Sequence, residues 1–73
     1  MRQNLKNARQ KAGMTQQQMA DKLHITIRHY KAIESGERLG SIELWDIMED
    51  LFSINQRKLR EISEIRRGKE DNL

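Results

Sequence analysis

The chain has 73 residues with 14 basic and 11 acidic side chains, a formal net charge of +3, no cysteine and no proline. This length predicts one domain with a small core, and the missing cysteines exclude a disulfide framework or a thiolate metal site. The N-terminus is polar, and no apolar run approaches the ~18 residues of a membrane span. We therefore expect a cytoplasmic protein without a membrane segment, stabilised by helix packing or by a partner.

The charge is distributed unevenly along the chain. Residues 1–38 carry eight basic and three acidic side chains, residues 39–56 carry four acidic and no basic ones, and residues 57–73 carry six basic and four acidic ones. A basic half beside an acidic segment indicates one face that meets a polyanion. Ordinary solvated helices would give the same pattern, so charge alone leaves both interpretations open.

The first expected helix covers residues 1–12 and ends before Gly13, which adopts the left-handed stop conformation freely. Its apolar face consists of Met1, Leu5, Ala8 and Ala12. The second helix, residues 16–23, has the clearest start signal. Thr15 is a natural N-cap, and Gln18 three residues later completes a capping box. This helix is expected to bury Met19, Ala20 and Leu23.

A short turn at His24 and Ile25 leads to the third expected helix, residues 27–35. Thr26 caps this helix and Gly36 ends it. The helical spacing points Tyr30 and Ile33 toward the core. The opposite, outward face carries Arg28, Lys31, Ala32 and Ser35.

The fourth expected helix covers residues 42–52 after the cap Ser41, and the fifth covers residues 56–66 after the cap Asn55. The fourth has a broad apolar face made of Ile42, Leu44, Trp45, Ile47, Met48, Leu51 and Phe52. The fifth has an apolar side made of Leu59, Ile62 and Ile65. Residues 67–73 have nothing to bury, so we expect a domain over 1–66 followed by a flexible charged tail.

The segment 16–35 contains two helices joined by a turn too short to let them lie antiparallel. Ala20 permits a close crossing, and Leu23, Ile25 and Tyr30 fill the angle between the helices. Such an arrangement is a helix-turn-helix, which projects its second helix from the body of the domain. An exposed helix fits the major groove of B-DNA.

The stretch MTQQQMADKLHITIRHYKAIESGER resembles the lambda-repressor/Cro-type (XRE-like) helix-turn-helix family. The matching features are the Thr-Gln-Gln opening, Ala20 at the crossing, Leu23 and Ile25 at the turn, and the Ile-Glu-x-Gly end. The segment GSIELWDIMEDLFSINQRKLREI looks like the fourth and fifth helices of that family in phage and mobile-element regulators. The resemblance covers residues 2–65 and implies an all-α, five-helix domain that binds operator DNA as a dimer.

The resemblance also implies site residues. Those that match DNA-contacting positions are Gln16, Gln17, Ile27, Arg28, His29, Ala32, Ser35 and Arg38. Thr26 at the start of the third helix and Lys31 on its outward face are further candidates for DNA contact. Arg9 and Glu34 match a buried salt bridge that ties the first helix to the third. No cofactor and no metal is implied, since two lone histidines do not form a metal site.

Three residues depart from the family pattern. His24 occupies a turn position usually held by glycine, and histidine tolerates positive φ better than most residues. Tyr30 replaces a smaller aliphatic residue, so its hydroxyl is expected to reach the surface. Ala32 can offer a base only a methyl contact, which leaves much of the base readout to Arg28.

Several of these residues also have a purely structural interpretation. Arg28, Lys31 and Arg38 could be solvated cations, and His29 could face solvent. Ile27 is either a thymine-methyl contact or the edge of the core. Gln16 lies at the N-terminus of a helix, and such a terminus favours a bound anion whatever side chain is there.

The sequence shows no catalytic constellation and no glycine-rich phosphate loop, so we expect no enzyme. The function predicted first is a sequence-specific transcriptional regulator, most simply a repressor, that acts on double-stranded DNA. The alternative is an antitoxin that binds a toxin partner and autoregulates its promoter, and a more distant one is a bridge using protein contacts alone. A homodimer would form through the stripe of Leu59, Ile62 and Ile65.

Overall fold

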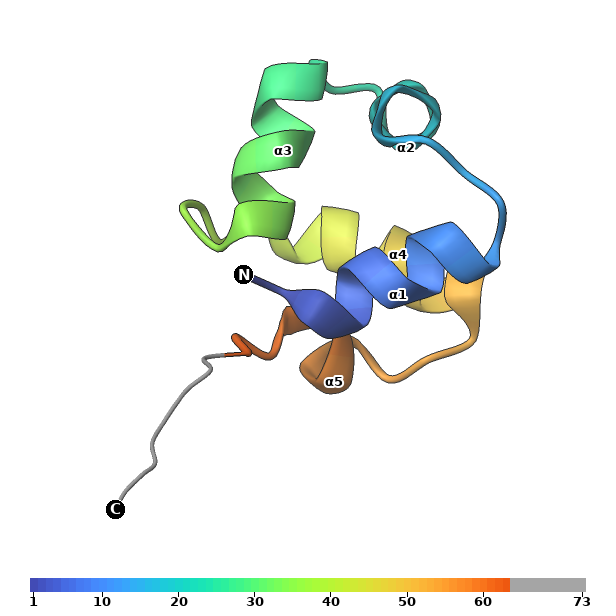
Figure 1. Ribbon diagram of the computed structural model, residues 1–73, viewed down its shortest axis with the longest axis vertical. Coiled ribbons are helices and arrows are strands. Elements are labelled where there is room, and N and C mark those ends of the chain that lie inside the picture. The colour runs from blue at the N-terminus through green and yellow to red at the C-terminus, as the bar shows by residue number, and fades with distance from the viewer. Residues whose placement is uncertain (64–73) are drawn as a thin grey trace.

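The computed structural model describes residues 1–63, which form a bundle of helices without a strand (Figure 1). In chain order the helices are α1 (Gln3–Lys11), α2 (Gln16–Leu23), α3 (Ile27–Ser35), α4 (Ile42–Phe52) and α5 (Gln56–Arg60). The expected all-α, five-helix class is therefore confirmed. Residues 64–66 of the expected fifth helix and the expected tail lie outside the described residues. None of the described helices has the length and apolar character needed to cross a membrane.

Capping side chains set the starts of four helices. The Thr15 hydroxyl accepts the Gln18 backbone N–H at 3.0 Å, and the Gln18 side-chain oxygen accepts the Thr15 backbone N–H at 2.8 Å. This reciprocal pair is the predicted capping box, and it satisfies two N–H groups that would otherwise lack a partner. The side chains of Thr26, Ser41 and Asn55 accept backbone N–H groups in the first turns of α3, α4 and α5.

The turn between α2 and α3 depends on His24, whose backbone is left-handed with a φ of +59°. The next residue, Ile25, donates its N–H back to the Ala20 carbonyl at 3.0 Å, which closes the end of α2. The chain therefore changes direction within three residues. As a result, α2 and α3 cross steeply instead of lying antiparallel (Figure 1).

One helix boundary is shifted by two residues from the predicted one, and another prediction is wrong. The first helix begins at Gln3 rather than at residue 1, because Arg2 has a non-helical backbone with φ −92° and ψ 82°. The fifth helix ends at Arg60 rather than at residue 66, because Glu61 is extended with ψ 132°. The two chain segments instead contact each other, since the Ser63 N–H donates to the Met1 carbonyl at 2.8 Å.

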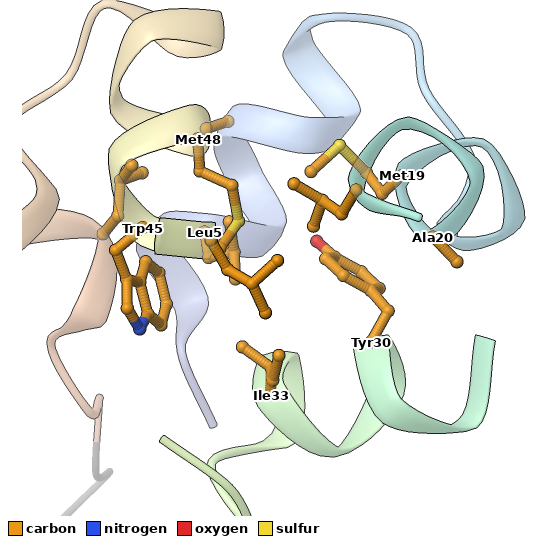
Figure 2. Packing of buried hydrophobic residues seen from close by; sticks show 11 residues of the cluster. Leu5, Met19, Ala20, Tyr30, Ile33, Trp45 and Met48 are labelled. Carbon is orange, nitrogen blue, oxygen red and sulfur yellow. The ribbon is translucent and has the colours of Figure 1, made fainter. Parts of the chain in front are cut away.

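The core gathers residues from all five helices around Trp45, Tyr30 and Leu5 (Figure 2). Its buried members are Leu5, Ala8, Met19, Ala20, Leu23, Tyr30, Ile33, Leu44, Trp45, Met48 and Leu59. The Trp45 indole N–H donates to the Leu39 carbonyl at 2.7 Å, which satisfies the ring's only donor.

Five residues expected on apolar faces are exposed instead: Met1, Ala12, Ile42, Ile47 and Ile62. The buried stripe of α4 is narrower than predicted, because only Leu44, Trp45 and Met48 are fully covered. Ile42 is the first residue of α4 and lies beyond the end of the core, with 69% of its surface exposed. Met1 and Ala12 flank α1 and are not part of it.

The left-handed turn at His24 gives a testable consequence. A residue with a Cβ costs about 1–2 kcal/mol in this conformation, whereas glycine adopts it freely. We expect His24→Gly to stabilise the domain by about 1 kcal/mol, seen as a rise of about 4–8 °C in melting temperature. Ser53→Gly should act the same way, because Ser53 ends α4 with a φ of +57°. The control Lys22→Gly lies in regular helix and should lower the melting temperature, and a fall for His24→Gly would contradict the argument.

Candidate nucleic-acid interface

The Glu34 carboxylate, in the last turn of α3, is bonded to side chains from three helices and is only 2% exposed. From α1, Arg9 donates through Nε at 2.8 Å and through Nη2 at 3.2 Å, which makes a two-point ion pair. From α2, the Gln16 amide donates at 3.1 Å. From α3 itself, the Tyr30 hydroxyl donates at 2.7 Å. Four hydrogen bonds therefore fix α1, α2 and α3 at one carboxylate.

These contacts change the protonation of the groups that make them. Burial alone would raise the pKa of Glu34, but the hydrogen bonds from Arg9, Tyr30 and Gln16 outweigh it and lower the pKa below 4.5. Burial raises the pKa of Tyr30, and the hydrogen bond to the Glu34 carboxylate raises it further. The hydrogen bond to Glu34 is also the main cause that raises the pKa of Arg9. At neutral pH the network therefore keeps Glu34 ionised and the Tyr30 hydroxyl protonated.

The expectation that the Tyr30 hydroxyl reaches the surface is wrong. Tyr30 has no exposed surface, and its ring points into the core beside Met19 and Ile33 (Figure 2). The acceptor of the hydroxyl is the buried Glu34 carboxylate, one helical turn further along α3. Gln16 is half-buried, and its amide likewise points to Glu34.

The outward side of α3 and the turn that follows it form an open groove. The groove is lined by Thr26, Ile27, Arg28, His29, Lys31, Ala32, Ser35, Glu37 and Arg38. Every one of these residues except Glu37 was singled out from the sequence as a candidate DNA contact. Gln16 and Gln17 are the two candidates that do not line it. Gln17 is exposed at the start of α2, where its amide donates to Asp21 at 3.0 Å.

The groove residues differ in how far they reach into solvent. The three cations, Arg28, Lys31 and Arg38, are exposed, whereas Ile27 and His29 are half-buried. Ala32 is only 9% exposed, so its expected place on the fully outward face is wrong. Its small side chain forms part of the groove floor between longer neighbours.

Polar groups at the ends of the groove already have partners. The Thr26 hydroxyl caps α3 by accepting the His29 backbone N–H at 3.1 Å. The Ser35 hydroxyl donates to the Ala32 carbonyl at 3.0 Å. Three exposed cations against the single carboxylate of Glu37 make the groove a positive surface suited to a polyanion.

The sequence analysis missed two residues in this region. Glu37 lines the groove and was not considered there. Arg2 is 3% exposed and donates to three main-chain carbonyls, although it was counted only as part of the basic half of the chain. One signal could have identified it: Arg2, Leu5 and Arg9 are spaced as one helical face, and the other two were expected to be buried, Leu5 in the core and Arg9 in a salt bridge.

Comparison with protein families agrees with this geometry. The model of the family described as Helix-turn-helix matches residues 5–55, which is more than two thirds of the chain and includes α2, the turn, α3 and α4. The chain belongs to the helix-turn-helix family. Within that family it is a lambda-repressor/Cro-type (XRE-like) regulator, so it is a DNA-binding transcriptional regulator in general terms. Searches among curated proteins and among solved structures gave no match.

The family is a regulatory one rather than an enzymatic one. Within residues 1–63, no group of three or more His, Cys, Asp or Glu side chains lies close enough to hold a metal ion. The groove itself offers hydrogen-bond donors, positive charge and a few apolar contacts.

The Glu34 network predicts a specific loss when one donor is removed. Tyr30→Phe keeps the ring but deletes one hydrogen bond to a charged acceptor, so it should cost about 1.5–3 kcal/mol of unfolding free energy at pH 7. Glu34 has a lowered folded pKa, so its stabilisation is complete above pH 4.5 and is lost as the pH falls through that lowered value. With one donor fewer, the pKa of Glu34 is lowered less, and the pH-dependent loss should shrink.

Urea unfolding of wild type and Tyr30→Phe at pH 7 and pH 3 measures both effects. The difference in unfolding free energy between the two pH values should be smaller for the variant. Glu43→Gln removes an exposed carboxylate and should stay within about 0.5 kcal/mol of wild type at pH 7. Equal pH-dependent losses in wild type and Tyr30→Phe would show that the hydroxyl does not contribute to the ionisation of Glu34.

Proposed function

We propose that this chain is a sequence-specific transcriptional repressor that acts in the cytoplasm by placing α3 in the major groove of operator DNA. The observation that carries the proposal is the groove along the outward side of α3 and the turn after it, where three exposed cations gather. A single α-helix fits the major groove, and basic side chains neutralise the flanking phosphates.

The positions of the groove residues suggest separate roles. Arg28 lies in the first turn of α3, the part of a recognition helix that usually reaches base edges, and its guanidinium can donate twice to guanine. Lys31 and Arg38 lie further along the groove, where the sugar-phosphate backbone would pass. Ile27 can contact a thymine methyl. Phosphate contacts orient the protein, whereas base contacts select the sequence.

The start of α2 provides a further set of donors. Gln17 is exposed there and is free to turn from Asp21 to a phosphate or a base edge. Ser35 and Thr26 border the groove and can add hydrogen bonds to the DNA backbone. His29 is half-buried, so only its outer edge is available to DNA.

A homodimer on DNA forms part of the proposal, with a surface that keeps only Ile62 of the predicted stripe. Leu59 is fully buried, so it cannot contact a second copy, and Ile65 lies outside the described residues. Large apolar side chains that are exposed include Met1 (43%), Leu39 (61%) and Ile62 (42%). They belong to the N-terminus, the loop after α3 and the segment after α5, which lie along one edge of the molecule (Figure 1).

Selection of bound duplexes from a random DNA library tests the proposed function directly. We expect one enriched sequence, arranged as an inverted repeat whose half-sites are about 10–10.5 base pairs apart, one turn of DNA. Enrichment of a single unrepeated site would contradict the dimer but support the reading of DNA by α3. No enrichment above the starting library would contradict sequence-specific binding.

The assignment of roles predicts different effects for three substitutions. Arg28→Ala should cost about 1–3 kcal/mol on the best site and relax the preference at one base pair. Lys31→Ala and Arg38→Ala should weaken binding to all sites alike, and each should reduce the slope of log affinity against log salt by about one unit. Affinities of the four proteins for the best site and its single-base variants, at several salt concentrations, measure this. If Arg28→Ala weakens every duplex equally, Arg28 contacts phosphate rather than a base.

A further inference from the structure

Arg2 occupies an unusual place for a residue so near the N-terminus. Its guanidinium is buried and donates through Nη1 to the Ile33 and Arg38 carbonyls and through Nε to the Arg60 carbonyl, the last two at 2.9 Å. Its own backbone N–H donates to the Glu34 carbonyl at 2.8 Å. Arg2 therefore joins the end of α3, the loop that follows it, and the end of α5.

A buried cation needs compensation, and here dipoles provide it in place of a carboxylate. Among the described residues no acidic side chain pairs with Arg2. Burial and the neighbouring Arg60 lower its pKa. The Ile33 and Arg60 carbonyls lie at the C-terminal ends of α3 and α5, where the helix dipole is negative. The guanidinium carbon also lies 5.3 Å from the centre of the Trp45 ring, within range of a cation–π contact.

The two carbonyls bound by Nη1 lie on either side of the turn that leaves α3. Ile33 is in the last turn of the helix, and Arg38 is the residue whose side chain lines the far end of the groove. The Arg38 backbone N–H donates back to the Ala32 carbonyl at 3.1 Å, so the turn is closed from both sides. Arg2 holds this turn from the interior while the Arg38 side chain lies on the outer surface.

We propose that Arg2 is a positioning residue for DNA binding: it fixes the turn after α3 so that the Arg38 side chain is set for its phosphate contact before DNA arrives. The inference rests on the proposed function of Arg38. A backbone segment held in its bound conformation loses less conformational entropy on binding, so Arg2 raises affinity without touching DNA.

The geometry requires arginine rather than any cation. A guanidinium presents five N–H donors in a rigid planar fork, and this fork reaches three carbonyls from different elements. A lysine ammonium is a compact point charge on a flexible stem and cannot hold the same three acceptors in one plane. Arg2→Lys therefore keeps the charge and most of the aliphatic side chain but loses the simultaneous hydrogen bonds to the three carbonyls.

The test is a double-mutant cycle on DNA affinity with Arg2→Lys and Arg38→Ala, using the best selected duplex. Residues that act through one contact depart from additivity, so the loss caused by Arg38→Ala should shrink by about threefold in the Arg2→Lys background. Arg28→Ala should add to Arg2→Lys within about twofold, because Arg28 lies at the other end of α3.

Asn4→Ala is the matched control for a general loss of stability. Asn4 ties α1 to α5 through bonds of 3.0 Å to the Lys58 carbonyl and to the Glu61 carboxylate, and neither bond involves α3 or its turn. It should lower the melting temperature but leave the effect of Arg38→Ala unchanged. Arg2→Met, which keeps the side-chain volume without the charge, repeats the cycle with a second variant.

Amide hydrogen exchange in the free protein gives a reading that does not depend on DNA. The Gly36 and Arg38 amides, bonded to the Ile33 and Ala32 carbonyls, should exchange faster in Arg2→Lys than in wild type, while α2 amides should not.

Additivity of Arg2→Lys with Arg38→Ala, or unchanged exchange at these two amides, would overturn the proposal. If wild type bound no duplex, both this inference and the proposed function would fail. Binding with an additive cycle would overturn only the role of Arg2.

Discussion

The Glu34 carboxylate is the point on which the arrangement of the first three helices depends. A buried anion is tolerated only when it is paired and hydrogen-bonded, and Glu34 receives its donors from α1, α2 and α3. A different crossing of α2 and α3 would leave at least one of these donors, or the carboxylate itself, without a partner. Breaking a buried pair by removing one member costs about 3–5 kcal/mol, a large share of the 5–15 kcal/mol available to a small domain.

This constraint divides α3 into two sides with separate tasks. The inner side carries Tyr30, Ile33 and Glu34, which bind the helix to the core and to its neighbours. The outer side carries Arg28 and Lys31, which the core does not need. Because the inner side is fixed by directional hydrogen bonds, the outer side is held at a defined angle to the body. A helix-turn-helix regulator needs such rigidity, since its recognition helix must enter the groove in one orientation.

The sequence predicted most reliably what local interactions decide. The starts of α2 and α3 follow from Thr15 and Thr26, whose hydroxyls bond to backbone groups three residues away. The left-handed turn at His24 was expected from the family resemblance. Most of the residues that line the α3 groove could also be predicted from their positions on that helix, although their contacts with DNA stay predictions.

What the sequence could not predict depends on contacts between distant parts of the chain. The ends of α1 and α5 are set by the bond between Ser63 and Met1, and by Arg2, whose acceptors lie 31 to 58 residues away. No local pattern encodes such pairings, so both helices were predicted too long. The Tyr30 hydroxyl was misplaced for a different reason. Its acceptor, Glu34, lies one helical turn away on α3 and was expected in a buried pair with Arg9, but the prediction did not connect the hydroxyl to that carboxylate.

The central claim is that the outer side of α3 is the surface that meets DNA. Backbone chemical-shift changes on titrating ¹⁵N-labelled protein with its selected duplex measure this most directly. We expect the largest changes at residues 16–17, 26–32 and 35–38, with small changes across the interior of α4. The largest changes on α4, or on the outer surface of α1, would contradict the account, because DNA would then bind a face that the α2–α3 crossing does not position.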